Sequence, residues 1–91
     1  MNFKEMEYLL AVEQEKNLSK AARTVGISQP AMSKCLRMVE AELDVSLFEK
    51  ISGEYIPTAA GKVFLNFAKE TKKRKNKFLR ELQELNQFKR G

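Results

Sequence analysis

Several side chains that can contact nucleic-acid bases are concentrated between positions 29 and 34. Gln29 and Ser33 are four residues apart, as are Pro30 and Lys34, so a helix would place all four on one face. An amide can bind adenine through two hydrogen bonds, an ammonium can bind guanine O6 and N7, a hydroxyl can bond to either base, and a proline ring can contact a thymine methyl group. The pattern predicts a helix face that reads bases in the DNA major groove. An ordinary solvated helix face is the alternative interpretation.

Arg37 lies one helical turn beyond Ser33 and continues this polar face. Its guanidinium suits a DNA phosphate better than a base. It could instead form an ion pair with Glu13 or Glu40. The whole chain has a net charge of +5 and a pI near 9.5, which favours a polyanionic partner, although many small domains are basic for solubility alone.

The composition argues against an enzyme and against a bound metal or cofactor. The chain has no histidine and a single cysteine, Cys35, which excludes an intramolecular disulfide, a histidine base and the usual Cys/His zinc sites. The carboxylates show no catalytic grouping, and no glycine-rich loop could hold a phosphate. Cys35 flanks an apolar stripe, so we expect it to pack as a small hydrophobic residue and not to act as a redox sensor.

The distribution of apolar residues predicts a protein of the reducing cytoplasm. The segment after Met1 lacks the apolar stretch of a secretory signal, and no apolar run approaches the roughly 18 residues that a membrane span requires. We therefore expect neither export nor membrane insertion.

The elements that must position the polar face are two helices joined by a glycine turn. Apolar spacing predicts a first helix over about 2–16, followed by a short helix capped by Ser19. Gly26 can adopt the left-handed conformation that ends this second helix, and Ser28 can cap a third helix over 29–43. This arrangement is typical of a helix-turn-helix motif, whose second helix enters the major groove.

The third helix should be held by a buried stripe on the side opposite its polar face, made by Met32, Leu36, Val39 and Leu43. A β-prone run over 45–51, a turn over 52–54 and a short return strand before Pro57 predict a two-stranded wing. Thr58 can cap a last helix that nothing interrupts before Gly91.

That last helix is too long to be covered by so small a core. A coiled-coil-like seam with steps of four and three residues, and a polar position at Lys75, predicts pairing with a second copy of the chain; its other members are Phe64, Ala68, Thr71, Phe78, Leu82 and Leu85. The basic run over 69–77 is interpreted as a solvated face, which near DNA would add attraction to phosphates.

The sequence resembles the N-terminal signature of LysR-type bacterial transcription regulators over residues 1 to about 65. The resemblance rests on Ser19-Lys20-Ala21-Ala22, Val25 to Lys34 with its Ser-Gln-Pro-Ala block, Leu36-Arg37, Leu47-Phe48-Glu49-Lys50 and Thr58-Ala59-Ala60-Gly61. It implies a mainly α fold, in which a winged helix-turn-helix domain of three helices and a two-stranded wing occupies 1–57. It also implies a linker and dimerisation helix over 58–91, which packs on this core at its start.

The resemblance also assigns roles to individual residues. It implies base contacts by Gln29, Pro30, Ser33 and Lys34, and backbone contacts by Ser19, Ser28 and Arg37. The chain departs from the family pattern at four positions, which are Cys35, Met38, Asp44 and Glu54. Glu54 lies near the wing tip, where relatives often carry an arginine that reaches the minor groove. Lys50 could take over part of that role.

These observations predict a homodimer that binds an inverted-repeat site in double-stranded DNA as part of a transcription regulator. Family members carry an effector domain after the linker helix, so a small-molecule effector would bind a C-terminal domain that this chain lacks. We expect either an excised fragment or a stand-alone module. The alternative function is a protein-interaction module whose long helix pairs with a full-length relative.

Overall fold

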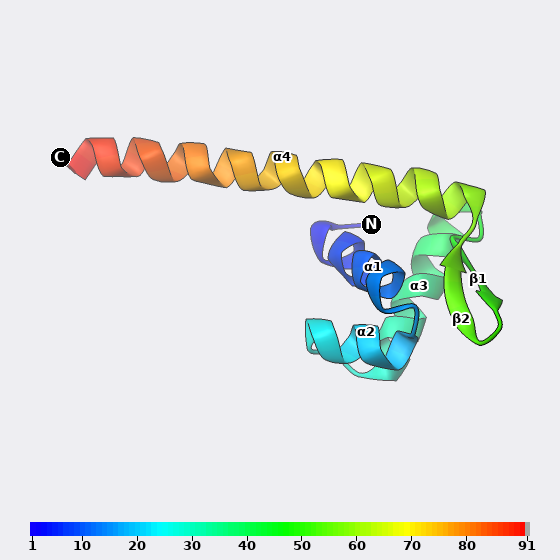
Figure 1. The fold of residues 1–91 in the computed structure, drawn as a ribbon. Coiled ribbons are helices and arrows are strands. Elements are labelled where there is room, and N and C mark those ends of the chain that lie inside the picture. Colours follow the sequence, from blue (N-terminus) through cyan, green and yellow to red (C-terminus); the bar gives the residue numbers. More distant parts are fainter. Residues whose placement is uncertain (91) are drawn as a thin grey trace.

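The computed structural model describes residues 1–90, and their side chains as far as residue 87. Four helices and one β-hairpin follow one another along the chain (Figure 1). Their bounds are α1 Phe3–Glu15, α2 Leu18–Val25, α3 Gln29–Leu43, β1 Phe48–Ile51, β2 Glu54–Pro57 and α4 Ala59–Arg90. The predicted winged helix-turn-helix with a long last helix is confirmed.

Local capping signals fix both ends of α1 and α2. Asn2 and Glu5 form a reciprocal capping box at the start of α1. The predicted cap of α2 is wrong, because Asn17 and not Ser19 accepts the hydrogen bond from the Lys20 N–H, at 2.9 Å. The helix therefore starts earlier, at Leu18, whose side chain belongs to the core. Asparagine caps a helix as well as serine does, so cap chemistry alone could not choose between them.

Gly26 ends α2 as predicted, with a φ of 79°. The Ile27 N–H returns to the Ala22 carbonyl at 2.9 Å, which closes a Schellman-type turn and directs the chain into α3. Ser28 caps α3 by accepting a hydrogen bond from the Ala31 N–H at 3.2 Å. These two turn residues hold the pair α2 and α3 in the helix-turn-helix arrangement.

The core side of α3 differs from the prediction at one position. Met32, Leu36 and Val39 are buried, and Cys35 joins them, whereas Leu43 is 37% exposed. Leu43 is the last residue of the helix, and Asp44 then turns the chain away with a φ of 55°. The spacing fixes which face a residue occupies, but it does not determine how far the covering elements extend.

The wing is an antiparallel hairpin in which Lys50 pairs with Tyr55 and Ile51 pairs with Glu54. Ser52 and Gly53 both have positive φ, at 51° and 82°, as the two central residues of a tight type I′ hairpin turn do. The first strand starts at Phe48, so residues 45–47 of the predicted β run lie outside the sheet.

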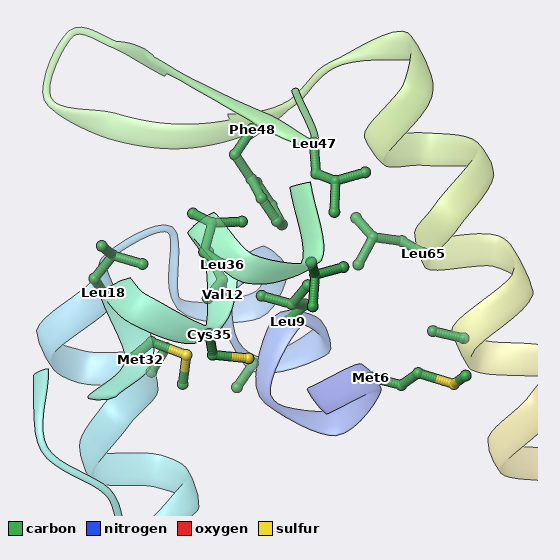
Figure 2. Close-up of a cluster of buried hydrophobic side chains, with 14 of the residues drawn as sticks. Met6, Leu9, Val12, Leu18, Met32, Cys35, Leu36, Leu47, Phe48 and Leu65 are labelled. Carbon is green, nitrogen blue, oxygen red and sulfur yellow. The ribbon is translucent and has the colours of Figure 1, made fainter. Parts of the chain in front are cut away.

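One hydrophobic core joins all four helices to the first strand (Figure 2). Leu9 and Val12 of α1, Met32 of α3 and Leu47 before the wing are completely buried. The start of α4 contributes three further members, Phe64, Leu65 and Ala68, with exposures of 6%, 1% and 1%. The first third of α4 therefore folds as part of the same core as α1, α2 and α3.

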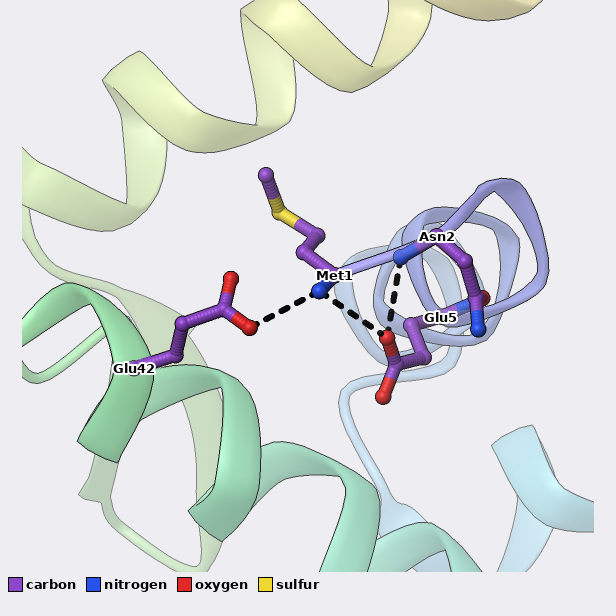
Figure 3. Close-up of polar contacts among 4 residues, drawn as sticks. All are labelled: Met1, Asn2, Glu5 and Glu42. Atoms are coloured by element: carbon purple, nitrogen blue, oxygen red, sulfur yellow. Dashed lines mark hydrogen bonds and ion pairs between the residues drawn. The ribbon is translucent and has the colours of Figure 1, made fainter.

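The start of α1 is also connected to the far end of α3 (Figure 3). The Met1 ammonium lies 2.8 Å from Glu42 Oε1 and 3.6 Å from Glu5 Oε1. The hydrogen bond to Glu42 raises the pKa of this ammonium above its ordinary value. The pair adds a polar contact between two helices whose main contact is apolar.

The long helix α4 crosses α1 and then projects beyond it (Figure 1). Lys69 pairs with Glu13 at 3.1 Å, Lys75 lies 3.9 Å from Glu7, and the Lys75 ammonium lies 5.1 Å from the centre of the Phe3 ring. The molecule is 56 Å long on its longest axis. Within residues 1–90, no helix combines the length and apolar character needed to cross a membrane.

Candidate nucleic-acid interface

The four residues predicted to read bases lie together on α3, in its first two turns. Gln29, Pro30 and Lys34 are exposed, Ser33 is half-buried, and Met32 points into the core on the opposite side. The exposed groups supply one amide, one hydroxyl and one ammonium. They lie beside the N-terminal end of the helix dipole, which also favours an approaching anion.

Arg37 bonds to Ser33 and not to either glutamate that the sequence offers. Its Nη1 atom donates a hydrogen bond to Ser33 Oγ at 3.0 Å. Glu13 is paired with Lys69. Glu40 accepts hydrogen bonds from the Leu47 N–H at 2.6 Å and from the Ser46 hydroxyl at 3.4 Å. The guanidinium therefore stays on the polar face, where a phosphate could reach it.

Glu40 belongs to a junction that positions the wing and α4 relative to α3. The Thr58 N–H donates to the Leu47 carbonyl at 3.0 Å, and the Thr58 hydroxyl bonds to the Ser46 carbonyl. Thr58 Oγ1 also caps α4 by accepting from the Gly61 N–H at 2.9 Å, as predicted. A Cβ atom at Gly61 would lie 1.8 Å from the Leu47 carbonyl oxygen, so only glycine allows this close approach. Sequence patterns gave no indication of Glu40 in this role, because its partners, the Leu47 N–H and the Ser46 hydroxyl, lie beyond the end of α3.

The remaining predicted backbone contacts come from three separate elements. Ser19 is exposed in the first turn of α2, and Ser28 is exposed at the start of α3. Lys50 is exposed on β1, with its ammonium 5.5 Å from the centre of the Tyr55 ring across the hairpin. Glu54 is exposed beside the wing turn, so the wing presents charges of both signs.

Cys35 lies behind the polar face, in the core. Burial raises the pKa of its thiol to about 11, with a smaller contribution from the charge of Glu5. The thiol therefore stays protonated near neutral pH and is a poor nucleophile. The prediction that Cys35 packs as a small hydrophobic residue is confirmed.

A second exposed surface lies on α4, and here the predicted seam needs correction. Phe64 and Ala68 are used by the chain's own core, so they cannot line an interface with a second chain. The neighbouring Val63 and Phe67 are 74% and 49% exposed. From Phe67 this face continues through Thr71, which is half-buried, and through four exposed residues, Arg74, Phe78, Leu82 and Leu85.

This apolar face borders an open groove. The groove has a volume of about 810 Å³ and includes Phe3 at the start of α1 together with Phe67 and Phe78 of α4. Phe3 is 52% exposed and lies at the edge of the core. The sequence did not single out Phe67, because two apolar faces of α4 overlap in sequence and only the packing of the helix on the core separates them.

The fold and the polar face define the class of protein. A two-stranded wing, a glycine turn and a recognition helix with an exposed polar face make the chain a winged helix-turn-helix domain. The chain belongs to the family described as "Bacterial regulatory helix-turn-helix protein, lysR family", whose profile matches residues 3–62.

Curated relatives are similar over most of this chain. The DNA-binding transcriptional dual regulator OxyR of Escherichia coli (strain K12) is 35% identical over 82 residues, which are 90% of this chain and 27% of that protein. The uncharacterized HTH-type transcriptional regulator YcgK of Bacillus subtilis (strain 168) is 33% identical over 87 residues, or 96% of this chain and 27% of YcgK. The chain thus spans about a quarter of the length of the curated relatives it matches.

Solved structures of DNA complexes share the same fold. The chain resembles that in the crystal structure of a CbnR DBD–DNA complex with a TM-score of 0.87 and 28% identity, over 93% of this chain and 98% of that chain. For the BenM DBD/benA site 1 DNA complex the TM-score is 0.89 with 26% identity, over 93% and 96% of the two chains.

Proposed function

We propose that this chain is the DNA-binding module of a LysR-type transcription regulator and binds a specific site in double-stranded DNA. The observation that carries the proposal is the exposed polar face of α3, formed by Gln29, Pro30, Ser33 and Lys34 at the start of the recognition helix. In a helix-turn-helix protein the N-terminal residues of this helix contact base edges. The similarity to two domains solved in complex with DNA supports binding to DNA by this chain.

In this proposal the other polar groups contact the sugar-phosphate backbone of the DNA. Ser19, Ser28 and Arg37 flank the reading face and contact phosphates, while Lys50 extends the contact from the wing. We divide the chain into a DNA-binding domain over 1–57 and a linker segment over 58–91, whose last residue, Gly91, lies outside the described part of the chain. The module has no enzymatic role, acts in the cytoplasm, and responds to small molecules only through a separate C-terminal domain.

We further propose a homodimer in which the exposed apolar face of α4 pairs with the same face of a second chain. The revised seam is Val63, Phe67, Thr71, Arg74, Phe78, Leu82 and Leu85. Five of these side chains are exposed apolar groups, and a helix of this length gains stability by burying such a face. Two recognition helices related by two-fold symmetry would enter successive major grooves, so the site should be an inverted repeat.

Selection of bound sequences from a random duplex library tests the proposal. We expect an enriched inverted repeat, and an affinity that falls by about three to five decades between 50 and 200 mM salt if the dimer neutralises roughly 6–10 phosphates. A chain that enriches no sequence and shows a flat salt profile would contradict DNA recognition. It would favour the alternative in which α4 pairs with another regulator.

A further inference from the structure

The hydrogen bond between Arg37 and Ser33 constrains what the reading face can recognise. Both residues lie on α3, one turn apart, and Arg37 Nη1 donates to Ser33 Oγ at 3.0 Å. The two glutamates that could compete for Arg37 have other partners. Glu13 forms an ion pair with Lys69 at 3.1 Å, and Glu40 accepts a hydrogen bond from the Leu47 N–H at 2.6 Å. The guanidinium is therefore free to stay on Ser33.

A serine hydroxyl has one hydrogen to donate and two lone pairs that can accept. The guanidinium occupies one lone pair, and its positive charge makes the site less favourable for a second donor. A hydroxyl that accepts from a cation is polarised and donates more strongly in turn. A free hydroxyl can both donate and accept, but the Ser33 hydroxyl beside Arg37 acts mainly as a hydrogen-bond donor.

The bases differ in what they offer to such a donor in the major groove. Guanine presents N7 and O6, adenine presents N7, and thymine presents O4, whereas cytosine presents only its N4 amino group, which is itself a donor. We propose that the Ser33–Arg37 pair makes α3 select a base with a hydrogen-bond acceptor and reject cytosine at the position that Ser33 contacts. This inference rests on the proposed function, because it requires α3 to lie in the major groove.

The test measures base preference at one position and not overall affinity. Sequences are selected from a random duplex library with the wild-type chain and with Ser33→Ala, Arg37→Met and Arg23→Met. Arg37→Met keeps an apolar stem and removes the guanidinium donor. Arg23→Met is the matched control, because it removes the same guanidinium from an exposed position in the last turn of α2, outside the proposed base-reading face.

We expect one position in each half-site at which the wild-type chain excludes cytosine. Ser33→Ala should lose this exclusion, Arg37→Met should weaken it, and Arg23→Met should leave it unchanged. Loss of a phosphate contact by Arg37→Met lowers binding to all sequences equally, so it does not affect this ratio. None of the three side chains is fully buried, and thermal melting checks that each variant is folded.

A modified base gives a second, chemical readout. Where the selected base is adenine, whose one major-groove acceptor is N7, replacing it by 7-deazaadenine removes that acceptor. This should weaken wild-type binding about fivefold, the effect of one hydrogen bond, and should not weaken Ser33→Ala.

Three results would overturn the inference while leaving the proposed function intact. They are cytosine at the Ser33-dependent position, unchanged discrimination in Arg37→Met, and no effect of 7-deazaadenine at a selected adenine. A wild-type chain that enriches no sequence would overturn the proposed function and this inference together.

Discussion

At the scale of single residues, the polar face of α3 carries two kinds of group, which the proposed function assigns to bases and to phosphates. Gln29 is exposed and uncharged, so its removal leaves the positive charges that attract phosphates in place. Arg37 contributes charge and also orients Ser33. Specificity and general affinity can therefore be changed independently in this helix.

Gln29→Ala should lower the affinity for the selected site by about 1–3 kcal/mol and leave binding to random duplex nearly unchanged, because it removes a base contact and no charge. Fluorescence anisotropy with both duplexes measures the two affinities. Gln87→Ala on the far part of α4 is the control and should change neither. Equal losses of Gln29→Ala on both duplexes would show that Gln29 does not read a base.

Cys35 should make the fold less stable at alkaline pH. Its pKa in the folded chain is about 11 against an ordinary value of 9.0. The unfolded chain therefore loses the thiol proton first, and the free energy of unfolding contributed by this group decreases as the pH rises from 9.0 toward 11. Urea unfolding of the wild-type chain and of Cys35→Ala across this range gives the difference. Parallel pH profiles for the two chains would rule out a raised pKa.

At the scale of elements, the junction around Leu47 determines how α3, the wing and α4 are joined. Glu40 of α3 holds the Leu47 N–H, Thr58 holds the Leu47 carbonyl, and Gly61 of α4 packs directly on that carbonyl. All three contacts are made to backbone groups. The angle at which the wing leaves the core is thus fixed by hydrogen bonds and close packing at a single residue.

In Gly61→Ala, helix propensity and a steric clash should change the free energy of unfolding in opposite directions. Helix propensity alone would make alanine more stable than glycine by about 1 kcal/mol inside α4. The new Cβ atom would lie 1.8 Å from the Leu47 carbonyl oxygen, so the junction must shift. We expect a net loss of about 1–3 kcal/mol in the free energy of unfolding.

Chemical denaturation of Gly61→Ala measures this change. Ala59→Gly, an exposed position in the same turn, reports helix propensity without the clash and should cost no more than about 1 kcal/mol. A Gly61→Ala chain more stable than the wild type would show that the junction can open without loss.

At the scale of the whole molecule, α4 has two apolar faces with different functions. One face, with Phe64, Leu65 and Ala68, completes the core of its own chain. The other, which includes Phe67 and Phe78, borders the groove beside Phe3 and remains exposed. Folding and the proposed dimerisation therefore depend on different side chains of one helix.

Replacing Phe78 and Leu82 by lysine should produce a folded monomer. These side chains are 54% and 46% exposed, so the core does not need them, while two charges in the proposed seam would oppose pairing. Analytical ultracentrifugation and circular dichroism measure assembly and folding. A monomer presents one recognition helix, so affinity for the inverted repeat should fall to that of a half-site.

Asn76→Lys with Gln83→Lys is the matched control for this experiment. It adds the same two charges to exposed positions of α4 outside the seam. This variant should behave like the wild-type chain. A seam variant that stays dimeric, or keeps full affinity for the inverted repeat, would exclude the surface that we propose.

The sequence by itself determined the elements and the reading face. Gly26, Ser28 and Thr58 act within a few residues of their own positions, so their turn and cap chemistry could be recognised directly. The period of apolar residues in α3 placed Gln29 and Lys34 on the side opposite Met32 for the same reason. Cap identity was less certain, since Asn17 and Ser19 are chemically equivalent signals.

Only the tertiary structure decided which apolar side chains of α4 are buried and which partner Arg37 bonds to. Phe64 and Phe67 lie on apolar faces with similar spacing, and the packing of α4 on the core buries the first and leaves the second exposed. The sequence offered Arg37 two glutamates as partners, but Lys69 and Leu47 engage them and Arg37 bonds to Ser33. Burial and pairing depend on contacts between residues far apart in the chain, and these contacts cannot be inferred from the residue spacing within one helix.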